Sequence, residues 1–181
     1  MRELGSVIVE EGIVQKPQKL RKTIREIILN EKNQILMLYS KRFNDYTFPG
    51  GGLKTNENEE KALKRELKEE IGASLIKIKE PLGFINEIKY GLFTNESIYL
   101  QTSIYYFVEV EEIGYKKLEK REIIDDIKPV FVDIDQCIIH NQSVMKDEKH
   151  QAYGLKTVLQ REEIVLKNIK ECLSTWENLK L

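Results

Sequence analysis

The sequence has little of what would tie it to a membrane, an oxidising compartment or a nucleic acid. Its only two cysteines, Cys137 and Cys172, are too few and too far apart for a disulfide framework. No apolar run approaches the roughly 20 residues of a membrane-spanning helix, and acidic residues stand where a signal peptide would be apolar. The 29 Lys and Arg residues are balanced by 30 Asp and Glu, which leaves no basic field for nucleic acid. We therefore expect a cytoplasmic protein without a membrane or nucleic-acid partner.

What the chain does contain fits one folded domain. Its 181 residues, 41% of them hydrophobic, are enough to bury a core. No internal repeat or low-complexity linker interrupts it. We expect a single domain over residues 1–181, with an N-terminal extension over 1–22 and a final helix over 155–179.

The order of local patterns is strands, helix, strands, helix. Apolar and β-branched runs predict strands at 23–30 and 34–39, joined as a hairpin, and at 82–90, 98–110 and 129–134. Asn95 and Glu96 are expected in the turn before the long strand. A helix is predicted over 57–71, ending at Gly72, and residues 6–10 and 12–15 form a candidate hairpin that would pack on the sheet or on a second subunit. These patterns favour an α+β fold with a mixed sheet between helices.

Three acids on the predicted helix share one face. At about 100° per residue, Glu66, Glu69 and Glu70 fall within roughly a third of the circumference. Like charges at this spacing repel, and a hard divalent cation such as Mg²⁺ relieves the repulsion by binding carboxylate oxygens. From the spacing alone, a merely solvated acidic face is the favoured interpretation. Leu63, Leu67 and Ile71 form the adjoining apolar sector that would pack the helix.

The whole stretch from Gly51 to Ala73 narrows this choice. Its sequence, GGLKTNENEEKALKRELKEEIGA, resembles the signature of the Nudix (MutT-like) hydrolases, G-x5-E-x7-R-E-U-x-E-E-x-G-U with U bulky and aliphatic. The matching residues are Gly51, Glu57, Arg65, Glu66, Leu67, Glu69, Glu70 and Gly72. Ala73 departs from the final aliphatic position, which affects local packing and no catalytic group. The resemblance places the Nudix box at 50–73 and implies the family's αβα sandwich.

The resemblance also implies roles for individual residues. Glu66, Glu69 and Glu70 would bind the catalytic metal, with the carbonyl of Gly50 as a further ligand, and Glu57 and Arg65 would orient the site. The metal would be Mg²⁺, with Mn²⁺ as an alternative, and it would activate a water that attacks phosphorus. The general base would be a box glutamate, Glu66 or Glu69, or a downstream glutamate. The downstream candidates are Glu96, Glu109, Glu111 and Glu112.

Substrate-binding candidates lie on both sides of the acidic helix. Arg42 is a phosphate contact or simply a charge at the end of a hairpin. Phe48 and Tyr90 are candidates to stack on a base, although aromatic residues in strands more often belong to the core. Gly51 lacks a Cβ and so allows the backbone to approach a phosphate closely.

The resemblance implies Mg²⁺-dependent hydrolysis of a diphosphate linkage in a nucleoside diphosphate derivative. Nucleoside triphosphates, sugar nucleotides and dinucleoside polyphosphates all remain candidate substrates. The N-terminal extension and the last helix are candidate surfaces for a homodimer. The main alternative is a catalytically silent nucleotide-binding module, although such proteins usually lose box acids. An isopentenyl diphosphate isomerase would need a cysteine and histidines near the box, but the first of these residues is Cys137. An unrelated α+β domain with an acidic helix is the last alternative.

Overall fold

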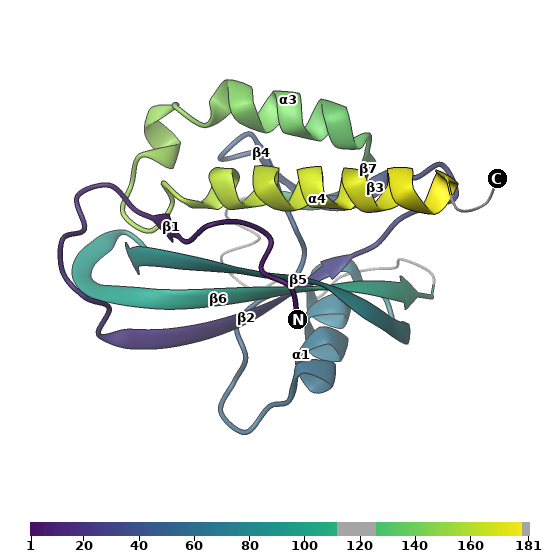
Figure 1. Cartoon of the computed structure of the whole chain (residues 1–181), viewed down its shortest axis with the longest axis horizontal. Coiled ribbons are helices and arrows are strands. Elements are labelled where there is room, and N and C mark those ends of the chain that lie inside the picture. Colours follow the sequence, from purple (N-terminus) through teal and green to yellow (C-terminus); the bar gives the residue numbers. More distant parts are fainter. Residues whose placement is uncertain (112–125, 179–181) are drawn as a thin grey trace.

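The computed structural model describes residues 1–111 and 126–178, and Figure 1 shows their arrangement. The strands and helices follow in chain order: β1 (Ile8–Val9), β2 (Lys19–Ile27), β3 (Ile35–Ser40), β4 (Asp45–Thr47), α1 (Glu59–Glu66), a π-helical turn (Leu67–Ile71), β5 (Leu75–Gly91), β6 (Thr94–Val110), β7 (Ile127–Val132), α3 (Ile134–Val144), a 3₁₀ turn (Glu148–His150) and α4 (Val158–Asn178).

The strands form two sheets. The larger has the order β1-β5-β6-β2, with β5 and β6 antiparallel and the two outer strands parallel to their neighbours. The smaller has the order β4-β3-β7 and is antiparallel. The predicted hairpin between 23–30 and 34–39 forms only at its tip, where residues 28–30 pair with residues 34–36. The turn at 30–33 forms, but the chain changes sheets there: β2 pairs with β6 along its whole length, and only the bridge Leu29–Ile35 with its adjacent hydrogen bonds joins the two runs.

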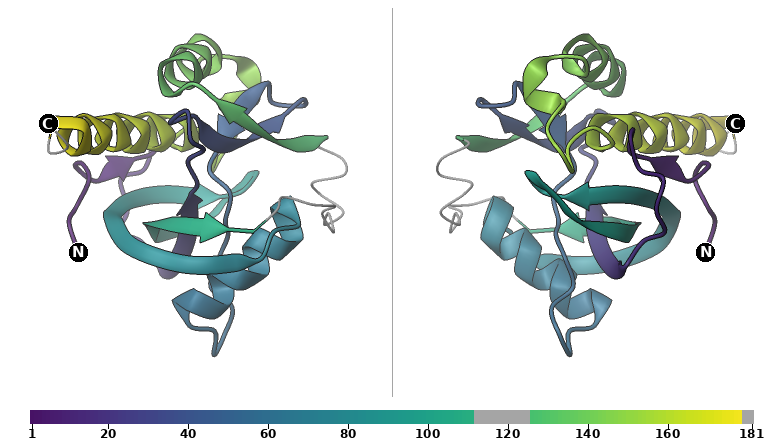
Figure 2. Two further views of the ribbon diagram at one scale, coloured as in Figure 1. Left: turned by 90° about the vertical axis from the view of Figure 1, so that its right-hand side faces the viewer. Right: turned by 90° about the vertical axis from the view of Figure 1, so that its left-hand side faces the viewer.

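Helices cover both faces of the larger sheet, with α1 on one side and α4 on the other, while α3 lies against α4 and strand β4 of the smaller sheet (Figure 2). Because side chains alternate along a strand, β2 contributes to two cores. Ile24 and Ile28 pack with Leu63 and Leu67 of the acidic helix segment, whereas Ile27 packs with residues of α3 and α4. The expected α+β fold with helices on both sides of a mixed sheet is confirmed, with part of the sheet split off as a second one.

Local chemistry sets the ends of the acidic helix. Asn58 caps it by accepting the backbone N–H of Lys61 at 2.9 Å, so α1 begins at Glu59, two residues after the predicted start. The last turn is π-helical, a widening that often occurs at functional sites. Gly72 ends it in the left-handed conformation (φ 66°) as predicted.

Two other predictions need correction, and one helix was missed. The turn between β5 and β6 lies at Leu92 and Phe93, so Asn95 and Glu96 belong to β6. Residues 6–10 do not form a hairpin with 12–15, because β1 pairs in parallel with β5. Helix α3 was not predicted, and it starts where Asp133 accepts the N–H of Gln136. No helix in the described part of the chain is long and apolar enough to span a membrane.

Candidate active site

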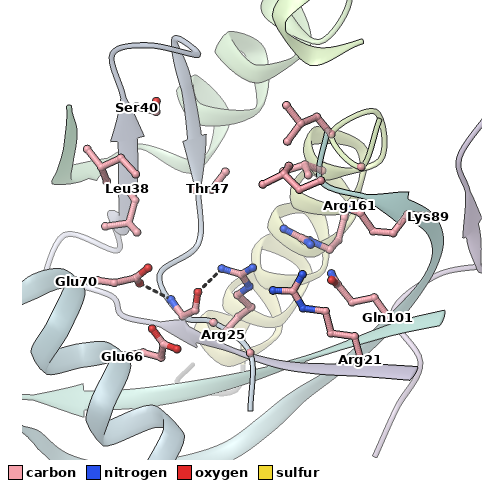
Figure 3. A pocket seen from close by; sticks show the side chains of 18 of the residues that line it. Arg21, Arg25, Leu38, Ser40, Thr47, Glu66, Glu70, Lys89, Gln101 and Arg161 are labelled. Atoms are coloured by element: carbon pink, nitrogen blue, oxygen red, sulfur yellow. Dashed lines mark hydrogen bonds between the residues drawn. The ribbon is translucent and has the colours of Figure 1, made fainter. Parts of the chain in front are cut away.

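A pocket of about 630 Å³ opens beside the acidic helix. The residues that line it come from distant parts of the chain. Acids on one side face cations on the other, as Figure 3 shows for the labelled side chains. The acidic side carries Glu66, Glu69 and Glu70, and the basic side carries Arg21, Arg25, Lys89 and Arg161. Such a pocket suits a ligand with several negative charges: the basic side would bind the ligand, and the acidic side would bind a cation associated with it.

Arg65 organises the acidic side. Its guanidinium donates two hydrogen bonds of 2.8 Å to the carboxylate of Glu57, a bidentate pair. It also donates to Glu66 at 2.6 Å, to Glu69 at 3.1 Å and to the carbonyl of Gly52 at 3.1 Å. The hydrogen bonds from Arg65 lower the pKa of Glu57 to about 2. Arg65 therefore fixes the acidic helix against the preceding loop.

The loop at Gly50 and Gly51 touches the acids directly. The N–H of Gly50 donates to Glu70 at 2.6 Å, and its carbonyl accepts from Arg25 at 2.5 Å. Gly50 has a φ of 118°, and a Cβ there would lie 2.2 Å from the carbonyl oxygen of Ile24. A Cβ on Gly51 would lie 2.2 Å from a carboxylate oxygen of Glu66. Only glycine allows this approach.

A fourth acid, Glu26, lies next to this loop and was missed by sequence reasoning. Its side chain is 0% exposed, and neither carboxylate oxygen has a hydrogen-bond partner among the described residues. Burial raises the pKa of Glu26 well above its usual value, and Glu70 and Glu66 raise it further. The signal was present in the sequence: alternation along the strand puts Glu26 on the same face as Ile24 and Ile28, where an apolar residue is expected.

The basic side is held by buried ion pairs. Arg161 on α4 donates to Glu87 at 2.9 Å and to Glu162 at 2.5 Å, and the ammonium of Lys89 lies 3.6 Å from Glu87. Burial alone would raise the pKa of Glu87, but Arg161 and Lys89 hold it at about 2. Glu87 is thus ionised and anchors both cations at the pocket wall. Arg161 lies far from Glu87 and Lys89 in the chain, and no local sequence motif predicts their contact.

Seven of the predicted site residues line the pocket: Gly50, Gly51, Arg65, Glu66, Glu69, Glu70 and Tyr90. Glu57 does not line it and reaches it through Arg65. The hydroxyl of Tyr90 donates to the carbonyl of Gly12 at 3.2 Å.

The structure places Phe48 and Arg42 elsewhere. Phe48 is 0% exposed in the core, edge-on to Tyr105, because its position beside the loop faces inward. Arg42 is exposed outside the pocket and stacks on the ring of Phe43. Neither residue has the placement expected of a substrate contact.

The downstream glutamates also lie outside the pocket where they are described. Glu96 is exposed on β6, and Glu109 pairs with Lys79 at 2.6 Å. Glu111 is exposed at the end of β6. Glu112 falls outside the described residues.

The donor set suits a hard divalent cation. It offers the carboxylates of Glu66, Glu69 and Glu70 and a backbone carbonyl, which are the oxygen ligands Mg²⁺ prefers. Burial raises the pKa of Glu66, although Arg65 opposes the rise. No three acidic, histidine or cysteine side chains in the described ranges converge tightly enough to form a ready metal cluster. Arg65 and the N–H of Gly50 instead hold these carboxylates in place.

Comparison with known proteins identifies the family. Residues 19–153 match the family model of the NUDIX domain. The chain belongs to the Nudix family. This confirms the resemblance carried by residues 51–73, and with it the expectation of a Nudix hydrolase.

Two curated proteins are similar to this Nudix chain. An 8-oxo-dGTP diphosphatase of Buchnera aphidicola subsp. Schizaphis graminum is 31% identical over 128 residues, which cover 65% of this chain and 90% of that protein. An RNA pyrophosphohydrolase of a Marinomonas species is 44% identical over 52 residues, 29% of this chain. That second match spans 32% of the relative, about a third of its length.

Solved structures share the Nudix fold at low sequence identity. The E. coli ORF135 protein matches with a TM-score of 0.57 and 15% identity over 87% of this chain and 93% of its own. A MutT protein from Bacillus halodurans matches with a TM-score of 0.51 and 20% identity, over 66% of this chain and 72% of its own. A MutT NUDIX hydrolase from Burkholderia pseudomallei matches with a TM-score of 0.50 and 20% identity, over 65% of this chain and 86% of its own. These likenesses support the fold.

Proposed function

We propose that this Nudix hydrolase cleaves a diphosphate linkage in a nucleoside diphosphate derivative with the help of Mg²⁺. The carrying observation is the pocket itself, in which the acids of the helix and a row of cations face the same space. The names of the two curated relatives, a diphosphatase and a pyrophosphohydrolase, agree with this class of bond.

The metal ligands we propose are Glu66, Glu69, Glu70 and the carbonyl of Gly50. A bound Mg²⁺ or Mn²⁺ would lower the pKa of the attacking water and offset phosphate charge. Arg25 fixes the Gly50 carbonyl from the pocket side, and Arg65 fixes the two carboxylates it touches. These hydrogen bonds hold the proposed metal-binding oxygens in position before the substrate binds.

Two groups of residues act on the substrate in this proposal. Arg21, Arg25 and Lys89 bind its phosphates from the basic side, because cations in a partly buried wall attract polyanions strongly. The water's proton passes to a box carboxylate. Of the two candidates, the side chain of Glu69 is 30% exposed and that of Glu66 10% exposed, so Glu69 is the better placed to contact water.

The test is divalent-cation-dependent phosphate or pyrophosphate release over a panel of substrates. The panel holds nucleoside triphosphates with 8-oxo-dGTP, sugar nucleotides, dinucleoside polyphosphates and a 5′-triphosphorylated RNA. We expect Glu69→Gln and Glu70→Gln to lower kcat by at least about a hundredfold, since each removes a group acting on the reacting centre. Glu60→Gln is the matched control, because this acid lies on the same helix, exposed and paired with Lys64.

Either outcome is informative. Turnover that persists in a folded Glu69→Gln variant would refute the proposed role of this residue. Absence of turnover for every substrate, together with a rise in melting temperature on adding nucleotide, would favour the silent binding module.

A further inference from the structure

We propose that Glu26 is an additional carboxylate ligand of the divalent cation held by the acidic helix. This inference rests on the proposed function, because it assumes that the Glu66–Glu70 face binds a cation. It adds a ligand from strand β2, outside the Nudix box, to donors that come from the helix and the glycine loop.

The position of the side chain is the first support. Glu26 lies on β2 between Ile24 and Ile28, both of which pack against the acidic helix segment. A Cβ placed on Gly50 would lie 2.8 Å from the Oε2 atom of Glu26, so this carboxylate is in direct contact with the loop. The same glycine donates its N–H to Glu70, so Glu26 and Glu70 meet at one residue.

The missing partners are the second support. Both oxygens of Glu26 are buried and make no hydrogen bond with the described residues. An unsatisfied buried polar group is strongly unfavourable, so native proteins pair such groups with a donor, a water or a cation. The largest charge effects on Glu26 come from Glu70 and Glu66, which repel it, and Arg25 offsets them only in part. A divalent cation would reverse this balance.

Arg25 does not remove the deficit. Arg25, the neighbouring residue in the strand, extends its guanidinium into the pocket (Figure 3). There Arg25 donates to the carbonyls of Phe48 and Gly50 at 3.1 and 2.5 Å. Its cationic group is therefore committed to the loop rather than to Glu26.

A cation bound by Glu26 would join three segments: strand β2, the loop at Gly50 and the acidic helix. Its binding would then stabilise the fold as well as support catalysis, because a ligand that binds only the native state raises its stability. If Glu26 had no role in cation binding, its substitution would leave the stabilisation by the cation unchanged. The two explanations differ in cation affinity, which can be measured without substrate.

The experiment measures Mn²⁺ binding by calorimetry and by electron paramagnetic resonance in the absence of substrate. Glu26→Gln keeps the shape of the side chain, and Glu26→Leu matches the neighbouring isoleucines, so at least one variant is expected to fold, as checked by circular dichroism. We expect the Mn²⁺ dissociation constant to rise about tenfold or more in both. The rise in melting temperature that saturating Mn²⁺ gives the wild type should shrink in both. Glu60→Gln serves as the matched control and should bind Mn²⁺ as the wild type does.

An unchanged Mn²⁺ affinity in a folded Glu26 variant would overturn this inference and leave the proposed function standing. A wild type that binds no Mn²⁺ would overturn the proposed function and this inference with it. Titrating the labelled wild type with Mg²⁺ gives a reading that needs no substitution. The ¹³C signal of the Glu26 carboxyl should shift at the same Mg²⁺ concentrations as that of Glu70, and a Glu26 signal that stays fixed would overturn the inference.

Discussion

Replacing Arg65 by glutamine should destabilise the protein in a way that depends on Glu57. The substitution removes both hydrogen bonds of the bidentate pair and leaves Glu57 without its cation. Side-chain exposures are 18% for Arg65 and 12% for Glu57, so the pair is neither fully solvated nor fully buried. Measured costs of breaking ion pairs range from about 0–1 kcal/mol at the surface to about 3–5 kcal/mol in the core. We expect a loss of about 2 kcal/mol in the free energy of unfolding, intermediate between these limits.

Thermal and denaturant unfolding give the measurement. At this chain length, about 2 kcal/mol corresponds to a fall of roughly 4–8 °C in melting temperature. A double-mutant cycle with Glu57→Gln isolates the pair, and we expect a coupling of about 1–2 kcal/mol. The matched cycle on Glu60 and Lys64, an exposed pair on the same helix, should show coupling within experimental error.

The cycle also tests the claim that Arg65 positions the acids. Arg65→Gln should lower kcat more than Glu57→Gln does, because only Arg65 also touches Glu66 and Glu69. A coupling near zero, or a melting temperature equal to that of the wild type, would contradict the assignment of Arg65 as the connection between helix and loop.

Three further predictions follow from the site. The pKa of Glu57 is lowered to about 2 in the folded protein. The ionised Glu57 carboxylate therefore stabilises the fold fully above about pH 4.5, and this stabilisation is lost as the pH falls toward 2. The melting-temperature difference between wild type and Glu57→Gln should shrink over that interval. Gly51→Ala should displace Glu66 and lower kcat by at least about tenfold while the circular dichroism spectrum stays unchanged, whereas full activity would show that the loop yields instead. Phe48→Leu should lower the free energy of unfolding by about 1 kcal/mol without changing KM, because Phe48 is buried in the core. Tyr90→Ala should raise KM, because Tyr90 lines the pocket. The reverse pattern would show that Phe48, and not Tyr90, contacts the substrate.

The acidic helix could be predicted because its information is local. Glu66, Glu69 and Glu70 follow one helical repeat, and Arg65 and Glu57 lie within the same short stretch, so their placement depends on one helix and one loop. The capping residue Asn58 and the final Gly72 mark its ends by their own chemistry.

Partners that meet only in the tertiary structure could not be predicted in the same way. The run that contains Ile27 shows that a strand exists, but not that it pairs with β6 instead of the next strand. The contact between Arg161 and Glu87 joins residues 74 positions apart, and neither carries a local sign of the other. Phe48 and Tyr90 look alike as aromatic residues, and only the fold decides which one faces the core.

The contribution of α4 to the pocket lies in a different stretch of sequence from the acids of the Nudix box. The segment matched by the family model ends at residue 153, yet Gly154, Leu155, Val158 and Arg161 all line the pocket. The acids that we propose for the chemistry lie inside that segment, whereas part of the proposed substrate-binding surface lies beyond it. Under the proposed function, mutations at the start of the last helix would therefore alter which compound fits the pocket and leave the proposed catalytic acids unchanged. Selection on substrate preference and selection on catalytic power can act on this chain through different stretches of sequence.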